Sequence, residues 1–284
     1  MKTIKTIIAV ILLSISITSC SEEDKDPIII DENPLAEYNL VTNVDANNHS
    51  IEIYSEQKDF TIGFNQLFIR IKDNDMDTYI SNASIQWKPV MHMTEMMHSC
   101  PKSDVTKTEN ATVYTGYVVF QMPGNSEEYW DLELEYTANG QVYNAIEKIN
   151  VKAPLDGKRR VNSFVGEDDS RYVMAMMPFQ PEIAVNDFEI MVFKMENMMN
   201  FPVVKNHKIV LDPRMPGMGN HGSPNNEDLV FDVGSGLYKG KLSLTMSGYW
   251  KLNLILVDEN AAIIKGETIT SDNESSSLFF EIEF

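Results

Sequence analysis

The strongest constraint on this chain is a two-residue alternation of apolar side chains that persists over most of its length. Residues 50–56 (SIEIYSE) and 60–73 (FTIGFNQLFIRIKD) place an apolar residue at nearly every second position, and Asn, Asp, Gly and Pro separate such runs. This period is that of a half-buried β-strand, whereas an amphipathic helix repeats about every 3.6 residues. No long stretch has the helical period. We therefore expect an all-β fold.

A second constraint is an internal repeat with a period close to 120 residues. Trp130 and Trp250 stand in similar strand patterns, EYWDLELEY and GYWKLNLIL, 120 positions apart. A Tyr-x-Gly motif precedes both, at residues 114–116 and 238–240. A long repeat of this kind indicates two copies of one structural unit, and a unit of this size can bury its own core as a β-sandwich. The repeat therefore predicts two tandem immunoglobulin-like β-sandwich domains.

The boundary between the two domains is predicted from a break in the alternation. Residues 154–162 (PLDGKRRVN) bring together Pro, Gly and three basic side chains, which is typical of a linker. The first sandwich is then expected over residues 37–153 and the second over residues 163–284. Trp130 and Trp250 lie in matching strands among alternating leucines, so we expect both to anchor the cores.

The N-terminus indicates export and lipidation. Residues 1–19 have two lysines followed by an apolar run too short to span a membrane, which is typical of a secretory signal peptide. The sequence ITSC that ends at Cys20 resembles a bacterial lipobox, in which the cysteine becomes the lipid-carrying first residue. The acidic SEEDKD that follows is similar to the export signal of surface lipoproteins of Bacteroidetes. Residues 20–36 carry acids and prolines and predict a flexible tether.

The charge of the chain restricts its partners. The formal net charge is −19 at pH 7, and removal of residues 1–19 would take away two lysines and no acids, which leaves −21. Such a surface repels nucleic acid and anionic lipid. We therefore expect no nucleic-acid partner. The expected membrane contact is the acyl group on Cys20, which predicts an outer-membrane lipoprotein that faces the periplasm or the cell exterior.

Two loops rich in methionine and histidine carry the candidate chemistry. Residues 91–101 (MHMTEMMHSCP) and 215–224 (MPGMGNHGSP) share the order Met-x-x-Met, His, Pro after one single-residue gap. Thioether and imidazole donors suit soft or borderline metals such as copper, and acids are nearly absent from both loops, which disfavours calcium and magnesium. The matched candidates are Met93, Met96, His98 and Pro101 in the first loop and Met215, Met218, His221 and Pro224 in the second. Cys100 and Met246 are additional candidate ligands.

Three other interpretations of these residues stay open. Methionine fills irregular gaps in cores, and the chain has 17 methionines, among them Met195 and Met198, which have no histidine close to them in the sequence. Zinc at His98 with Cys100 is a second interpretation, although two ligands fall short of the four of a structural site. Cys100 is the only thiol left once Cys20 is acylated, and its fate is burial, an intermolecular disulfide or metal ligation.

The segments MPGMGNHGSP, GLYKGKLSLTMSGYW and KLNLIL are similar to the YtkA-like, or FixH-like, domain. That domain is a small extracytoplasmic β-sandwich with a Met-x-x-Met and His loop and a Gly-x-Trp strand. The first half of the chain is a divergent copy, since MTEM replaces its Met-Pro-Gly-Met and the segment between Met122 and Trp130 is longer. The resemblance implies copper handling, with a copper-dependent protein or transporter as partner, and favours the second loop as the better-defined site.

No catalytic motif stands out, since GxSxG, HExxH, C-x-x-C and a glycine-rich phosphate loop are all missing, so we expect no enzyme. The leading hypothesis is a membrane-anchored extracytoplasmic protein that binds copper(I) and stores or delivers it. One alternative is a non-catalytic adhesion or ligand-binding module without metal, which would bind a glycan or a protein through exposed aromatic residues such as Trp87, Tyr54 or Tyr79. Another is a purely structural partner in a larger envelope complex.

Overall fold

A computed structural model describes residues 33–284, so the predicted signal peptide, the lipobox with Cys20 and most of the predicted tether lie outside the described residues. Within residues 33–284 the secondary structure is β-strand, with one three-residue 3-10 helix, η1 (Pro216–Met218). No helix in this part of the chain is long and apolar enough to cross a membrane. The all-β prediction is confirmed.

The first half of the chain forms two antiparallel sheets and one short parallel pair. One sheet has the order β1 (Asn39–Ala46), β2 (His49–Ser55), β4 (Gly63–Asp73), β9 (Tyr114–Phe120), β8 (Thr106–Lys107), with β5 (Thr78–Tyr79) on the end of β4. The other has the order β11 (Gln141–Ile149), β10 (Tyr129–Ala138), β6 (Ser84–His92), β7 (Met97–His98). The parallel pair joins β3 (Phe60–Thr61) to β12 (Val151–Lys152).

This strand order is that of an immunoglobulin-like sandwich. With β2 taken as strand A and β4 as strand B, the sheets become A-B-E-D and G-F-C-C′. The side chains that alternate inward from β4, β9, β6 and β10 form one shared core cluster. The predicted immunoglobulin-like architecture is therefore confirmed by the topology of the strands themselves.

The second half repeats this order in its main strands. Its sheet runs β13 (Val161–Val165), β14 (Arg171–Met176), β15 (Val185–Lys194), β19 (Leu237–Ser243), β18 (Glu227–Asp232), β16 (Lys208–Met215), β20 (Tyr249–Val257), β21 (Ile263–Lys265). Two further strands, β17 (His221–Gly222) and β22 (Leu278–Glu283), pair with β16 and β20. The repeated orders are β14-β15-β19-β18 and β22-β20-β16-β17. Because β18 pairs with both β19 and β16, the two layers join into one continuous sheet here.

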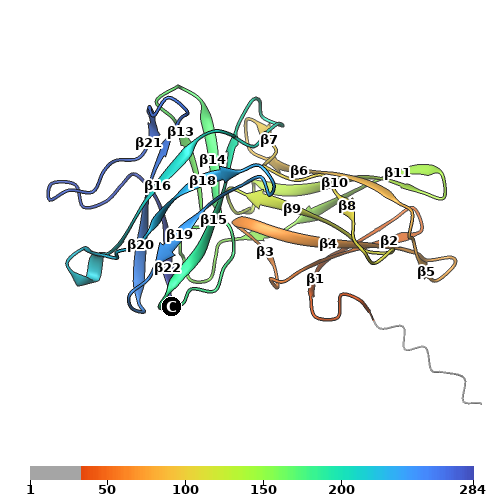
Figure 1. The fold of residues 1–284 in the computed structure, drawn as a ribbon. Helices are drawn as coiled ribbons and strands as arrows, with labels where there is room; N and C mark the ends of the chain where they lie inside the picture. The colour runs from red at the N-terminus through yellow and green to blue at the C-terminus, as the bar shows by residue number, and fades with distance from the viewer. Residues whose placement is uncertain (1–32) are drawn as a thin grey trace, which may run out of the picture. The chain divides into compact units, whose positions relative to one another are not determined.

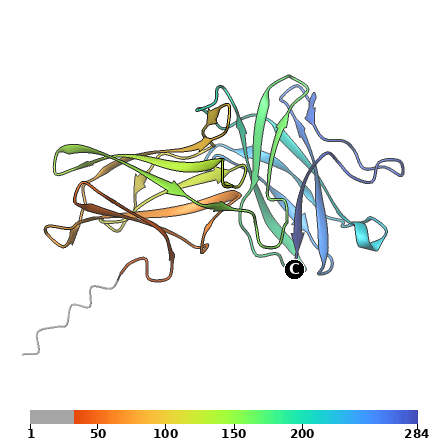
Figure 2. The ribbon, with the colours of Figure 1, turned by 180° about the vertical axis from the view of Figure 1, so that it is seen from behind.

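Strand pairing separates the two halves. Figure 1 and Figure 2 show the strands up to β12 gathered into one body and the strands from β13 into another, and every pairing in the described chain stays within its own half. Residues 34–284 nevertheless form one compact unit. Strand β13 begins at Val161, so it takes in the last two residues of the predicted linker 154–162. The domain boundaries themselves stay predictions.

The two repeated tryptophans are the largest fully buried side chains of the described chain. The indole Nε1 of Trp130 donates a hydrogen bond of 3.0 Å to the Met122 carbonyl, and that of Trp250 donates one of 3.0 Å to the Met246 carbonyl. Burial of the ring and satisfaction of its only donor occur in the same way in both halves. The prediction of two core anchors is confirmed, and Met122 occupies the position of Met246 despite the longer segment before Trp130.

The repeated Tyr-x-Gly motif reflects a lack of space. A Cβ on Gly116 of β9 would lie 2.7 Å from the Trp87 ring, and one on Gly240 of β19 would lie 2.5 Å from the backbone carbonyl oxygen of Glu227. Ordinary carbon contacts need about 3.5 Å or more. Glycine at these two positions therefore lets the neighbouring strand or ring approach β9 and β19 closely.

We expect Gly240→Ala to lower the free energy of unfolding by about 1–3 kcal/mol, because the added methyl group would force backbone to shift. Gly217→Ala is the matched control, since a Cβ there meets nothing within 4 Å. Urea unfolding of both variants measures the difference. Equal stability of the two variants would contradict the steric explanation of the motif.

Candidate functional site

The first Met/His loop is a hairpin between β6 and β7. Met91 lies opposite His98 in the ladder, and the Met93 amide donates to the Met96 carbonyl at 2.9 Å, which closes the turn. Met91 is fully buried, Met93 packs partly against the core, and Met96 is 49% exposed. The methionines of this loop therefore differ in burial, from the buried Met91 through the partly buried Met93 to the exposed Met96.

The second loop forms a similar hairpin, but its residues correspond to those of the first loop in a different alignment from the predicted one. Met215 lies opposite His221 between β16 and β17, just as Met91 lies opposite His98. Both methionines are buried, Met215 as the last residue of β16 and Met91 as the last but one of β6. The predicted match of Met93 with Met215 is therefore wrong by two residues, because the buried methionine that lies opposite the loop histidine is the equivalent position.

The first loop lines a cavity of about 540 Å³. Five methionines and one histidine contribute to its wall, and the only charged residue there is Arg171. These six residues come from three segments of the chain: Met93, Met96, His98, Met122, Met195 and Met198. The structure thus brings together three of the predicted ligands with three methionines that were not predicted as ligands.

The cavity lies where the first half of the chain meets the segment that follows β15. The Ser99 amide donates a hydrogen bond of 2.8 Å to the carbonyl of Met198, and the Met195 amide donates one of 2.8 Å to the carbonyl of Arg171. Beside the cavity, an apolar cluster combines side chains of β4 and β9 with side chains of β14 and β15. Backbone hydrogen bonds and apolar packing therefore hold the two walls of the cavity together.

His98 has the tautomer that a metal ligand needs. Its Nδ1 lies 2.7 Å from the Ser99 carbonyl oxygen, and a carbonyl only accepts, so Nδ1 carries the hydrogen and the neutral ring keeps its lone pair on Nε2. The ring meets Trp130 edge-on, with centroids 5.6 Å apart. Histidines that bind metals generally donate their other ring nitrogen to such a partner. The donor set of the cavity therefore fits a soft metal ion.

The opposite wall is fixed by an ionic hydrogen-bond network. Tyr172, which lines the cavity, donates its hydroxyl to Asp168 at 2.9 Å, and the Lys194 ammonium lies 3.1 Å from the same carboxylate oxygen. Burial opposes ionisation of Asp168, but the hydrogen bonds from Tyr172, Lys194 and Ser170 outweigh it and lower its pKa to about 2. Burial and the neighbouring Asp168 raise the pKa of Tyr172. At neutral pH the Tyr172 phenol is therefore neutral and donates to Asp168, so its oxygen does not act as an anionic metal ligand.

Cys100 does not line the cavity. Its side chain is 2% exposed, belongs to the core of the first half, and has its pKa raised well above the ordinary value by burial. A buried neutral thiol is a poor metal ligand and a poor nucleophile. Of the three fates left open by the sequence, the structure shows burial.

We expect Cys100→Ala to leave metal affinity unchanged, because the thiol lies in the core and not in the cavity wall. For the same reason the native chain should resist a thiol-alkylating reagent that modifies the urea-unfolded chain readily. Mass spectrometry after timed alkylation checks the second point. Fast alkylation of the native chain would contradict the assignment of Cys100 to the core.

The predicted ligands of the second loop have separate environments. Met215 is buried in the second core with its Cε beneath Gly248, and Met246 packs partly against the same core. Met218 on η1 is 59% exposed, and His221 is exposed. None of these four residues lines the methionine cavity. The first loop, and not the second, is therefore the part of the described chain that contributes to a methionine-rich cavity.

Harder ligands do not gather in the described chain. Within residues 33–284, no group of three or more His, Cys, Asp or Glu side chains is placed to hold a metal ion. The proposed zinc pair also separates, since His98 lines the cavity whereas Cys100 is buried in the core. Any metal chemistry of the described residues therefore depends on thioether donors.

The aromatic residues expected of an adhesion module are mostly internal. Trp87 is 3% exposed and donates its indole hydrogen to the Ser103 carbonyl at 2.7 Å, and Tyr54 is buried. Only Tyr79 is partly exposed, and the Arg70 guanidinium lies 3.3 Å from its ring centroid. The expectation that Trp87 and Tyr54 are exposed binding residues is wrong, because both belong to packed parts of the first sandwich.

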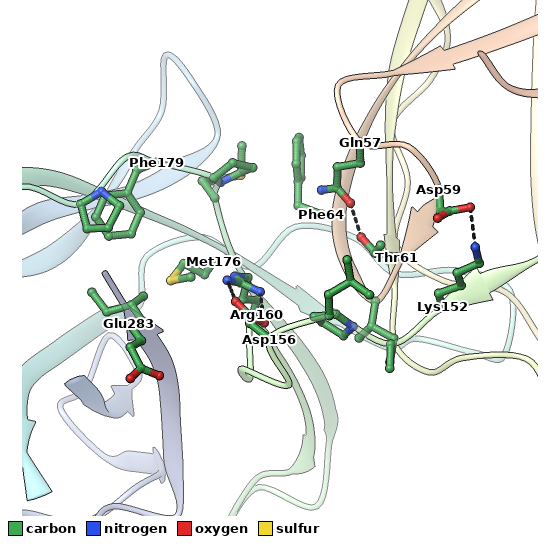
Figure 3. Close-up of a pocket in the computed structure, with 18 of the residues that line it drawn as sticks. Gln57, Asp59, Thr61, Phe64, Lys152, Asp156, Arg160, Met176, Phe179 and Glu283 are labelled. Atoms are coloured by element: carbon green, nitrogen blue, oxygen red, sulfur yellow. Dashed lines mark hydrogen bonds and ion pairs between the residues drawn. The ribbon is translucent and has the colours of Figure 1, made fainter. Parts of the chain in front are cut away.

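A second cavity of about 580 Å³ lies beside the linker. Two of the basic residues in its wall are paired with acids, Arg160 with Asp156 and Lys152 with Asp59 (Figure 3). The Lys152 pair has an N to O distance of 2.7 Å. Because acidic partners already neutralise their charges, these basic side chains are less available to bind a ligand than the donors of the methionine cavity are.

Three cavity residues were not predicted from the sequence: Met122, Met195 and Met198. A usable signal was present for two of them, since Met195 and Met198 themselves have the Met-x-x-Met spacing. They were assigned to packing because no histidine is close in the sequence. The histidine is instead close in space, since the Met198 carbonyl accepts from the residue that follows His98.

Comparisons with known proteins give a distant structural match. No family model and no curated protein matches this chain. One similar solved structure is described as FdeC, a novel broadly conserved Escherichia coli adhesin eliciting protection against urinary tract infections. The match has 13% sequence identity and a TM-score of 0.26, and it covers 86% of this chain and 66% of the other. A likeness this distant carries no argument about function, so the assignment to the all-β immunoglobulin-like class depends on the strand order described above.

Proposed function

We propose that this chain is an extracytoplasmic copper(I)-binding protein that stores or delivers the ion. One observation carries the proposal: five methionines and His98 line a single cavity that has no carboxylate in its wall. Thioether and imidazole groups are the donors that copper(I) prefers, whereas calcium and magnesium need oxygen ligands. Met93, Met96 and His98 would hold the ion, with the lone pair of His98 Nε2 as the nitrogen donor.

The choice of a carrier over an enzyme is supported by the same donors. Thioethers bind copper(I) more weakly than thiolates do, and the one cysteine of the described chain is buried as a neutral thiol. A site without thiolate suits a protein that must release its ion. The partner in this proposal is a copper-dependent protein or transporter of the envelope, in line with the resemblance to YtkA-like domains.

Anchoring to a membrane is the second part of the proposal. It is supported by the apolar start of the sequence, by the lipobox-like ITSC that ends at Cys20, and by the acidic tether that follows. The lipid on Cys20 would hold the protein to the outer membrane, because a formal charge of −19 gives no electrostatic attraction to anionic lipid. Radioactive fatty-acid labelling of the wild type and of Cys20→Ala tests this part separately.

Copper binding is tested by competition with a chromogenic copper(I) chelator under reducing conditions, with zinc and calcium in parallel titrations. We expect the purified chain to withdraw copper(I) from the chelator and to bind zinc and calcium at least about tenfold more weakly. No withdrawal of copper, or equal affinity for zinc, would refute the proposed function.

A further inference from the structure

We infer that the copper site is shared between the two sandwiches, with Met195 and Met198 of the second sandwich completing the ligand set that Met93, Met96 and His98 provide from the first. This inference rests on the proposed function and adds two ligands and a consequence to it. Because the donors come from both halves of the chain, bound metal would hold the halves together.

The first support is the placement of the Met195–Met198 turn. The backbone is fixed at its start by the bond from the Met195 amide to Arg171 and at its end by the bond from Ser99 to the Met198 carbonyl. Within the turn, the Glu196 amide donates to the Asn200 carbonyl at 3.0 Å. The turn is thus hydrogen-bonded to Ser99, the residue after His98, and both of its methionines line the cavity.

The second support is that packing alone does not account for Met198. The apolar cluster that joins the halves already contains a buried methionine, Met191, among aromatic and β-branched side chains, and Met195 packs against this cluster. Met198, by contrast, is 43% exposed. A residue selected to fill a gap would be expected inside the cluster. Flexible thioethers at the rim of a cavity that holds a histidine fit a ligand role better.

The third support is the balance of donors in the cavity wall. The first sandwich brings Met93, Met96, Met122 and His98, and the second sandwich brings Met195 and Met198 together with Arg171 and with apolar and hydroxyl-bearing side chains. No carboxylate lines either side. The only soft donors that the second sandwich adds are therefore the two sulfurs of this Met-x-x-Met turn.

A shared site couples metal binding to the contact between the halves. A ligand that binds one arrangement of a protein more tightly than another increases the population of the preferred arrangement. Contacts between domains of one chain are generally small enough to open and close. Copper(I) bound by residues of both halves would therefore favour the closed contact and protect the hydrogen bond from the Ser99 amide to Met198.

The test uses the full chain with Met195→Leu and Met198→Leu together, because leucine keeps the apolar volume and removes the sulfur. Met199→Leu is the matched control, since Met199 is 40% exposed, lies next to Met198 and does not line the cavity. We expect the double variant to lose about tenfold or more in copper(I) affinity. The control should change by less than about twofold, within the spread of a neutral surface substitution.

A second readout separates the inference from the proposed function. In the wild type, copper(I) should slow hydrogen exchange of the Ser99 amide, and in the double variant it should not. If the wild type binds no copper, the proposed function fails. If the wild type binds copper but the double variant matches Met199→Leu in affinity and in exchange, the site belongs to the first sandwich alone and the inference is overturned.

Discussion

Replacement of Met93 and Met96 by leucine and of His98 by phenylalanine, all in one variant, is expected to reduce the copper(I) affinity by a factor of about 100 or more. Loss of a partner that only orients a metal ligand already costs about 10–100-fold, and this variant removes three direct donors. The substitutions keep the apolar volume of the cavity wall, so the fold should persist. Competition against a copper(I) chelator measures the loss, and urea unfolding verifies the fold.

The matched control is the corresponding triple substitution in the second loop, at Met215, Met218 and His221. We expect it to change copper(I) affinity by less than about threefold, because Met215 is buried in the core whereas Met218 and His221 are exposed. The opposite result, with the second-loop variant inactive and the first-loop variant normal, would restore the interpretation suggested by the YtkA-like motif and remove the methionine cavity from the account.

Replacement of Trp250 by alanine is expected to lower the free energy of unfolding of its sandwich by about 3–5 kcal/mol, the usual cost of deleting a large buried aromatic side chain. The variant also leaves the Met246 carbonyl without the indole donor that lies 3.0 Å away. The same change at Trp130 should have a similar effect, since that ring is equally buried and donates to Met122 in the same manner.

Urea unfolding followed by tryptophan fluorescence and circular dichroism measures both variants, with Trp250→Phe as the conservative control that keeps part of the buried area. The phenylalanine variant should lose less than the alanine variant, because only the indole edge and its hydrogen bond disappear. A loss below about 1 kcal/mol for Trp250→Ala would contradict the role of this ring as a core anchor.

The sequence was sufficient to predict the fold because the fold depends on local and repeated patterns. The alternation in segments such as residues 60–73 encodes which face of a strand is buried, and the strand order then follows the immunoglobulin-like type. The repeated Trp130 and Trp250 predicted two cores, and both rings are buried. The repeated Gly116 and Gly240 are explained by the close approach of neighbouring groups. The alternation depends on residues a few positions apart, and the repeat is visible in the sequence without knowledge of any contact.

The site was harder to predict because it depends on contacts between distant residues. The two hairpin turns differ in length by one residue. The alignment of the two loop sequences matched Met93 with Met215, whereas the strand pairing shows that Met91 is the equivalent of Met215. Met195 and Met198 are about 100 residues from His98 in the sequence. Nothing in a linear pattern shows that the Ser99 amide bonds to the Met198 carbonyl.

Cys100 illustrates a second limit. The residue stands beside His98 in a metal-binding type of string, yet its side chain is directed into the core and its pKa is raised by burial. Strand β7 ends at His98, so Cys100 lies beyond the strand and its side chain is not held on the same face as that of His98 by the strand alternation. A count of potential donors therefore overstates the ligand set of residues 91–101.

X-ray absorption at the copper K edge of the copper(I)-loaded full chain tests whether sulfur donors of the methionine cavity bind copper(I). We predict a first coordination shell dominated by sulfur with one nitrogen scatterer, and loss of the sulfur contribution in the variant that lacks Met93, Met96 and His98. A shell of oxygen and nitrogen scatterers without sulfur in the wild type would contradict the account.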